Sequence, residues 1–198
     1  MDFFEELNKN DIQYCVLEYD AENQYVDMFV HPNDNKKYLK LLKHLNYKEI
    51  TPPMREYAFI YRLKPDVSYI SPEGVTIHSA CQMSCVSLSN LSKCKLPLDN
   101  SIQESLWKNK IWDAEHKYWK ICLEDHLIQI LTKCVFNQKE FDKQSIQWIE
   151  ECGVDLDNAE LVQKLEGVFF FFTPELILHI KEKRFDKIIY DYRTFRNY

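Results

Sequence analysis

The chain has 198 residues, of which 45% are hydrophobic and 14% aromatic, so it can bury a substantial core and is not intrinsically disordered. Its 31 acidic side chains outnumber its 25 lysines and arginines, and the net charge of −6 disfavours a protein that binds nucleic acid. Only three glycines are present, and neither G-x-G-x-x-G nor G-x-x-x-x-G-K-[ST] occurs, which excludes Rossmann-type and P-loop nucleotide sites. The length suits one domain, or one small α/β domain with a helical appendage.

The sequence shows neither an N-terminal signal pattern nor a membrane-spanning segment. The N-terminal stretch MDFFEELNKN is acidic, and no apolar run reaches the roughly 20 residues that are needed to span a bilayer. The seven cysteines are an odd number, as expected for reduced thiols rather than for a disulfide framework. We therefore expect a cytoplasmic protein that does not associate with membranes.

The first elements alternate between helix and strand. Residues 2–8 predict a short helix with one apolar face. Ile12–Leu17 is apolar on both faces, as in an internal strand, and Tyr25–Val30 forms a second strand. The residues between them are too few for a helical crossover, so the two strands should pair antiparallel. The run Lys36–Leu45 is amphipathic and predicts a helix packed on one face of the sheet.

Short apolar runs separated by turn residues predict that the sheet continues. The predicted strands are Tyr47–Ile50, Ala58–Leu63, Val67–Ile70 and Val75–His78. Residues 79–98 are rich in Ser, Cys and Leu without a clear period, which indicates an irregular link between two parts of the chain.

Helical patterns dominate from Ser101 onward. Ser101 and Glu104 form a capping box that opens a helix, and Thr173 before Pro174 has the pattern of an N-cap. The later elements are a strand at 118–122 and helices at 123–136, 142–152, 158–172, 173–183 and 186–192. We predict an α+β fold with a mixed β-sheet core in residues 1–98, flanked by helices, and a helical C-terminal part in residues 99–198.

The strand Tyr25–Val30 carries a single carboxylate, Asp27. Nucleotidyl transfer uses divalent ions held by carboxylates, and a D-x-D pair on a strand projects both carboxylates from one face. Here Tyr25 and Phe29 flank Asp27 on that face, so further ligands must come from other segments.

Other carboxylates follow or connect the predicted strands. Glu18 and Asp20 lie just past the end of the strand that precedes Asp27, and cross-strand neighbours are about 5 Å apart, within reach of one metal site. Asp66 and Glu73, in turns between later strands, could supply a third ligand.

The layout of residues 14–34, YCVLEYDAENQYVDMFVHPND, resembles the core of the nucleotidyltransferase-like superfamily. More narrowly, it is similar to nucleotidyltransferase-like proteins of bacterial surface-glycan gene clusters, in which a V-L-R-x-Y-D/E strand leads into D-I-D-I-L-V and a helix. The resemblance covers residues 12–141 and includes the helix LEDHLIQIL at Leu123–Leu131. In this chain Tyr25 takes the place of the first aspartate, and Thr76 takes the place of the carboxylate in a motif like I-D-L-H.

The resemblance implies a Mg²⁺-dependent transfer to a small phosphate or sugar acceptor in surface-polysaccharide metabolism. It implies a catalytic role for Asp27, and we expect Asp20 and Glu18 to be the catalytic carboxylates that replace the missing ones, with Asp27 and Asp20 as metal ligands. We expect the nucleotide or sugar substrate to contact Tyr25, His78 and Asp66.

Two further groups of residues have a functional and a structural interpretation. His78, Cys81, Cys85 and Cys94 have zinc-ligand chemistry, but the spacing lacks paired C-x₂-C elements, so we expect no structural zinc. The tail Lys181–Tyr198 interleaves basic and aromatic residues, as strand-binding proteins do, but a docked terminal helix is favoured on so acidic a chain. His126 could face a cleft, although a role in capping and packing its helix is favoured.

Three functional hypotheses follow. The first is a metal-dependent nucleotidyltransferase of surface-glycan or small-molecule metabolism. The second is a catalytically degenerate relative that binds a nucleotide, a glycan precursor or a partner protein, which the incomplete carboxylate set favours. The third is an interaction domain of an unrelated α+β fold.

Overall fold

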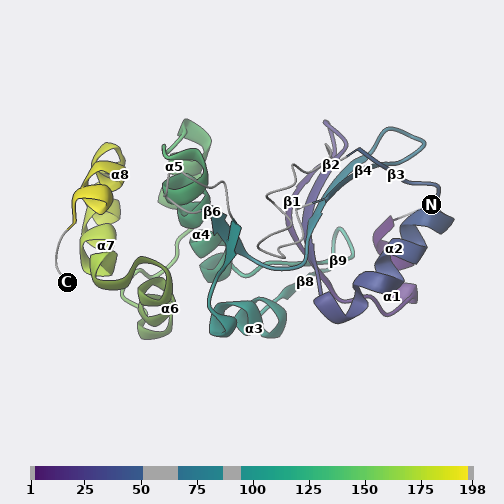
Figure 1. Ribbon diagram of the computed structural model, residues 1–198, viewed down its shortest axis with the longest axis horizontal. Helices are drawn as coiled ribbons and strands as arrows, with labels where there is room; N and C mark the ends of the chain where they lie inside the picture. The colour runs from purple at the N-terminus through teal and green to yellow at the C-terminus, as the bar shows by residue number, and fades with distance from the viewer. Residues whose placement is uncertain (1–2, 51–66, 87–94, 196–198) are drawn as a thin grey trace. The chain divides into compact units, whose positions relative to one another are not determined.

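The computed structural model describes residues 3–50, 67–86 and 95–195, which fall into two compact units (Figure 1). The sheet unit comprises Met1–Met83 and Gln103–Cys122, and the helical unit comprises Ser84–Ile102 and Leu123–Tyr198. Helices and a mixed sheet are both present, so the protein is of the α+β class that the sequence predicts.

The predicted boundary after residue 98 does not coincide with the division between these units. Residues 103–122 belong to the sheet unit because they contain β8 (Ile111–Asp113) and β9 (Tyr118–Lys120). β9 pairs in parallel with β1 (Tyr14–Asp20) and antiparallel with β8, so backbone hydrogen bonds hold this segment to the sheet. The sequence predicts β9 but not β8, which has only three residues and therefore shows no period.

A mixed sheet of seven strands, in the order β3-β4-β5-β2-β1-β9-β8, forms the centre of the sheet unit. β1 and β2 pair antiparallel, which confirms the prediction, and β2 pairs in parallel with β5. The other strands of this sheet are β2 (Tyr25–Val30), β3 (Lys48–Glu49), β4 (Val67–Ile70) and β5 (Thr76–Ala80). The predicted strand Ala58–Leu63 lies outside the described residues.

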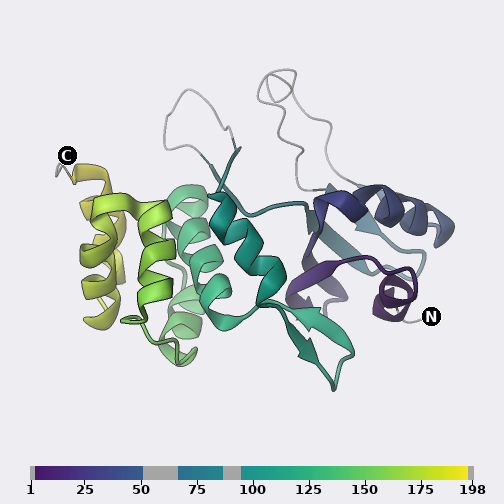
Figure 2. The same cartoon turned by 90° about the horizontal axis from the view of Figure 1, so that it is seen from below.

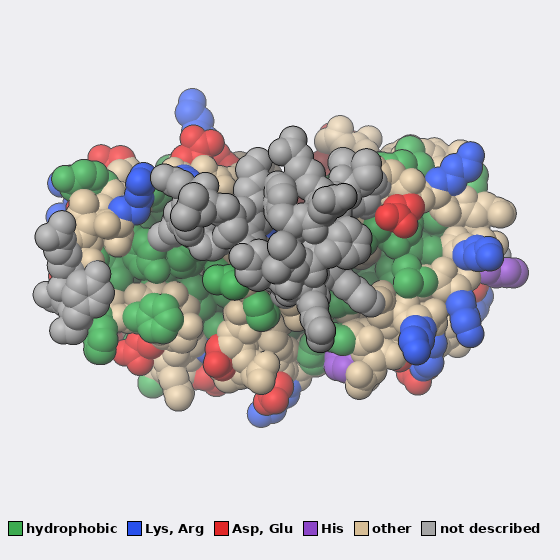
Figure 3. Space-filling view, in the orientation of Figure 1, with side chains coloured by type: hydrophobic (Ala, Val, Ile, Leu, Met, Phe, Trp, Pro, Cys, Tyr) green, Lys and Arg blue, Asp and Glu red, His purple; other side chains and the backbone are tan. Residues whose placement is uncertain are grey.

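Two helices, α1 (Phe3–Lys9) and α2 (Asn35–His44), cover one face of this sheet (Figure 1). Their apolar side chains form a single buried cluster with Val26, Met28 and Ile77 of the central strands. Because apolar residues recur three and four positions apart in α2, one side of the helix is buried while its lysines stay exposed. Lysine and arginine side chains accordingly gather on this part of the surface (Figure 3).

The helical unit is built mainly of helices that pack on one another, α4 on α6, α6 on α7 and α7 on α8 (Figure 2). Its helices are α4 (Leu123–Thr132), α5 (Lys143–Glu151), α6 (Ala159–Phe169), α7 (Thr173–Lys181) and α8 (Phe185–Thr194). α4 continues into a π-helical segment, η3 (Lys133–Gln138), and α6 into the 3₁₀ turn η4 (Phe170–Phe172). The helix α3 (Asn100–Lys108) begins in this unit and ends in the sheet unit.

Part of the link expected over residues 79–98 is regular structure. β5 extends to Ala80, and β6 (Ser84–Val86) pairs antiparallel with β7 (Lys95–Pro97) in a small separate sheet. The amide side chain of Asn137 accepts a hydrogen bond from the backbone N–H of Val86 at 2.9 Å, which ties this hairpin to the π-helical segment. The prediction failed here because strands of three residues are too short to show alternation.

Several helix ends follow from local sequence. Asp142 accepts a hydrogen bond from the N–H of Ser145 at 2.7 Å at the start of α5, and Gly153 follows its end at φ +68°, as predicted. Two predicted caps are wrong. Asp99, rather than Ser101, accepts the N–H at the start of α3 at 2.8 Å, and Thr173 is the first residue of α7 rather than its N-cap.

Buried polar pairs and aromatic rings join the helices of this unit. Lys164 of α6 lies 3.2 Å from the fully buried carboxylate of Asp125 in α4. Phe169 and Phe172 are buried, and both rings contact Tyr192 of α8. Their neighbours Phe170 and Phe171 are 67% and 73% exposed, so only part of this phenylalanine run anchors the core. Among the described residues, no helix combines the length and apolarity needed to cross a membrane.

Leu42 and Leu39 of α2 provide a matched test of the sheet unit's core, since they are 2% and 42% exposed. Leu42→Ala should lower the free energy of unfolding by about 2–5 kcal/mol, because it removes buried methyl groups and leaves a cavity. Leu39→Ala should change it by less than about 0.5 kcal/mol. Urea unfolding, with amide hydrogen exchange in β2 as the local probe, measures both. Equal losses in the two variants would contradict the observed burial.

Candidate functional site

A β-bulge at Leu17 determines which side chains of β1 and β2 share a face. Val16 pairs with Met28 and Glu18 pairs with Asp27, so one residue of β1, Leu17, is left over between the two pairs. A bulge of this kind shifts the alternation of the strand by one residue. Glu18 therefore shares a face with Asp27, opposite the face that Met28 buries against α1 and α2.

Polar side chains continue across the sheet from this pair. Asp27 of β2 is aligned with His78 of β5, and His78 is aligned with Ser68 of β4. Residues aligned on adjacent strands project from the same face about 5 Å apart. Glu18, Asp27, His78 and Ser68 thus form one line across four neighbouring strands, which we call the polar row.

The central contact of the polar row joins Asp27 to His78. The Oδ1 atom of Asp27 lies 3.0 Å from Nδ1 of His78, and the two side chains are 27% and 30% exposed. An ionised carboxylate can only accept a hydrogen bond, so this arrangement places the proton on Nδ1. One oxygen of Asp27 is consequently engaged within the protein.

Two other residues that the sequence predicts at the site, Asp20 and Tyr25, lie in the row of aligned residues next to the polar row. Asp20 is aligned with Tyr25, and Tyr25 is aligned with Thr76. Both carboxylate oxygens of Asp20 accept hydrogen bonds from Asn23, from its backbone N–H at 2.9 Å and from its side-chain amide at 2.7 Å. The backbone N–H of Asn23 is the main reason that the pKa of Asp20 lies below its ordinary value. Asp20 therefore closes the β1–β2 turn.

The carboxylates present fit one divalent ion better than two. Glu18 and the second oxygen of Asp27 lie on the same face, and Mg²⁺ is commonly held by one or two carboxylates together with water and phosphate oxygens. The part of the chain that the structure describes has no group of three His, Cys, Asp or Glu side chains arranged to hold a metal. Asp66 lies outside the described residues, and Glu73 is an exposed turn residue.

The candidate zinc ligands are divided between the units. His78 and Cys81 belong to the sheet unit, Cys85 lies on β6 of the helical unit, and Cys94 is outside the described residues. Zinc binds the thiolate form of cysteine. Burial raises the pKa of Cys85, which disfavours that form.

The other candidates have structural contacts. The ring of His126 lies 4.4 Å from that of Trp148, so it packs α4 against α5. In the tail, Lys181, Lys183 and Arg184 form ion pairs with Asp157, Glu150 and Glu182. Since Phe195 also packs on Phe172, the described part of the tail is a docked helical end.

Two features of the site are not predicted from the sequence. Ser68 occurs in the predicted strand Val67–Ile70, whose alternation would have placed it on the face opposite Tyr69, but nothing in the sequence aligns it with His78. The bulge at Leu17 leaves no signal in the sequence, since neither glycine nor proline marks the position.

Comparisons of the chain with protein-family models, with curated proteins and with solved structures gave no match.

A double-mutant cycle tests the Asp27–His78 contact. We expect a coupling energy of about 1 kcal/mol between Asp27→Ala and His78→Ala, the usual value for a partly buried hydrogen bond. His78 has further interactions, and the cycle cancels them because they are lost in both backgrounds. Urea unfolding of the four proteins gives the coupling. A value near zero would show that the two side chains do not stabilise each other.

We predict that the purified protein carries no stoichiometric zinc, because the ligand spacing lacks paired elements and the Cys85 thiol is disfavoured as thiolate. Elemental analysis of protein prepared without a metal-chelating tag measures the content. One zinc per chain, lost in Cys81→Ser but kept in Cys152→Ser, would refute the prediction.

Proposed function

We propose that this chain is a nucleotidyltransferase-like protein of surface-glycan or small-molecule metabolism that binds a nucleotide or sugar phosphate on the polar row and has little or no transferase activity. The observation that carries the proposal is the pairing of Asp27 with His78, which engages the one carboxylate retained from the D-x-D motif. The sequence resemblance is the basis for the family in this proposal, and the engagement of Asp27 supports the expected loss of activity.

The arrangement of the sheet unit is compatible with such a site. β1, a short turn, β2 and α2 follow one another, and the helices cover the face opposite the polar row. The polar row offers two carboxylates, an imidazole and a hydroxyl, which can bind sugar hydroxyls directly. Glu18 and Asp27 repel phosphate groups, so the sugar hydroxyls must supply most of the binding free energy.

Little activity is expected because transfer requires more positive charge than one site provides. Two ions normally bridge the triphosphate and the attacking oxygen, and each stabilises charge that develops in the transition state. With Asp20 engaged by Asn23 and Tyr25 at the first aspartate position, a second ion has no evident ligands among the described residues. The uncompensated charge raises the barrier by several kcal/mol.

Metal-dependent transfer is the second candidate, and one observation favours it. The bulge at Leu17 brings Glu18 opposite Asp27, so a glutamate from β1 could replace the missing aspartate of β2. In that case Glu18 and Asp27 would hold the ion together, and both would be needed for binding of a nucleotide with Mg²⁺.

Calorimetric titration of ATP and CTP, with and without Mg²⁺, separates the two candidates. We expect Mg²⁺ to change the affinity of the wild type by less than about tenfold, equivalent to about 1.4 kcal/mol, since one partly engaged site holds the ion weakly. Asp27→Asn and Glu18→Gln should alter this small effect only slightly. Glu115→Gln, a matched loss of one exposed charge outside the polar row, is the control.

Each outcome decides between the candidates. Strong Mg²⁺-dependent binding that is lost in Asp27→Asn and Glu18→Gln, but kept in Glu115→Gln, would establish the transferase candidate. Failure of ATP, CTP and a sugar phosphate to bind under any condition would refute a ligand site on the polar row.

A further inference from the structure

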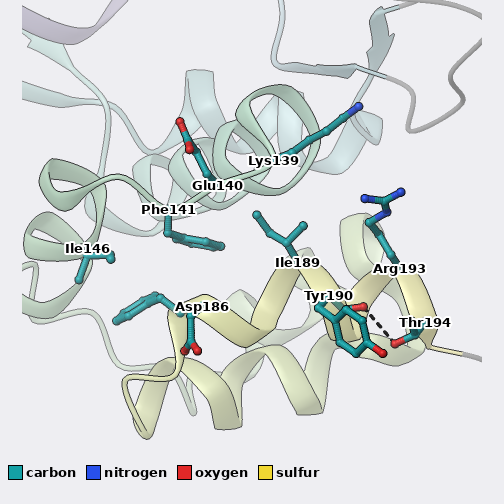
Figure 4. Close-up of a pocket in the computed structure, with 10 residues that line it drawn as sticks. Lys139, Glu140, Phe141, Ile146, Asp186, Ile189, Tyr190, Arg193 and Thr194 are labelled. Atoms are coloured by element: carbon teal, nitrogen blue, oxygen red, sulfur yellow. Dashed lines mark hydrogen bonds between the residues drawn. The ribbon is translucent and has the colours of Figure 1, made fainter.

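The helical unit contains a pocket of about 740 Å³ that is separate from the polar row. Its walls are the chain after the π-helical segment η3, the start of α5 and one side of α8 (Figure 4). The volume lies in the range of roughly 300–1,000 Å³ that is typical of small-molecule sites.

The floor of the pocket is apolar. The rings of Phe141 and Phe185 lie 5.6 Å apart, and the half-buried side chains of Ile146 and Ile189 continue this surface. Tyr190 of α8, 70% exposed, adds an aromatic ring at the rim. A flat ring or a short apolar chain would remove this surface from water, at about 25 cal/mol per Å².

Two cations occupy one end of the pocket. Lys139 and Arg193 come from opposite walls, and their charged groups lie on the same side in Figure 4. Neither has an acidic partner in the described segments, whereas the nearby Lys181, Lys183 and Arg184 are each paired with an acid. The charge at this end is therefore available to a ligand, and arginine suits bidentate binding of phosphate or carboxylate.

The backbone beside the pocket is unusual. η3 is π-helical, a conformation that accounts for well under 1% of residues and is frequent at functional sites. The chain leaves it at Lys139, which has φ +62°, and the N–H of Glu140 donates to the carbonyl of Cys134 at 3.1 Å. This exit directs residues 139–141 into the wall of the pocket, so the rare segment and the cationic end are structurally connected.

We propose that this pocket binds a small anion with a flat aromatic ring, its anionic group held by Lys139 and Arg193 and the face of its ring on the apolar floor. Phosphate and carboxylate both supply the anionic group, as in a nucleoside monophosphate or an aromatic acid. Glu140 and Asp186 also line the pocket, and their oxygens can accept hydrogen bonds from an amino group on the ring. The proposal is independent of the polar row, which belongs to the other unit.

Calorimetric titration with four probes tests this assignment. AMP carries a phosphate and a ring, adenosine lacks the phosphate, inorganic phosphate lacks the ring, and indole-3-acetate carries a carboxylate in place of the phosphate. We expect AMP or indole-3-acetate to bind about 10- to 100-fold more tightly than adenosine or phosphate, because both parts of the pocket are then used. The tighter of the two identifies the anionic group.

Variants locate the binding. Arg193→Gln and Lys139→Gln should each weaken it about tenfold, while Lys187→Gln, on the same helix α8 but outside the pocket, should leave it unchanged. Both cations are exposed and unpaired among the described residues, so the variants should fold, and circular dichroism verifies this.

The proposal is overturned if neither ring-bearing anion binds, if binding survives loss of both cations, or if Lys187→Gln weakens it equally. Binding that is lost in Asp27→Asn but kept in Arg193→Gln would assign the ligand to the polar row instead. Failure of the pocket and failure of the proposed function are therefore distinguishable.

Discussion

Strand β2 is the element on which the sheet unit depends. It pairs antiparallel with β1 on one edge and in parallel with β5 on the other, so both halves of the sheet are joined through its backbone. One of its faces buries Val26 and Met28 beneath the helices, and the other presents Asp27 to the polar row. Because side chains alternate strictly along a strand, burial of the first face fixes the orientation of the second. The position of Asp27 is thus a consequence of core packing.

The bulge in β1 places Glu18 on the face of Asp27, which regular alternation of the strand would not do. Without it, Glu18 would share the buried face with Val16, where an unpaired carboxylate costs several kcal/mol. With one residue left over, Glu18 faces Asp27 while Tyr19 joins the aromatic rings of Phe4 and Tyr118. A single inserted residue therefore satisfies the core and places two carboxylates side by side. Two neighbouring carboxylates repel each other unless a cation or a hydrogen-bond donor lies near them. The imidazole of His78 can be that donor to Asp27.

The sequence predicts the regular parts of this structure because their periods are strong. The bounds of β2 and of β4 match the predicted strands, and α2 lies within one or two residues of its predicted range. Three-residue strands and the bulge escape prediction because they leave no periodic signal. Contacts between distant segments, such as Asp27 with His78, depend on strand order, which the pattern does not specify. The pocket combines residues 139–146 with residues 185–194, and only the packed helices bring these segments together.

The two candidate surfaces differ in the sign of their charge, and this difference has a chemical consequence. The polar row presents Glu18 and Asp27, which repel an anion, so sugar hydroxyls are the groups that can bind it directly. The pocket presents Lys139 and Arg193, so the same anion binds it directly and is weakened by salt rather than strengthened by metal. A phosphate group therefore favours the pocket, whereas an uncharged sugar favours the polar row. Lys139 and Arg193 are exposed, so water and salt screen their charge, and the adjoining apolar floor must supply the rest of the binding free energy of a ring-bearing anion.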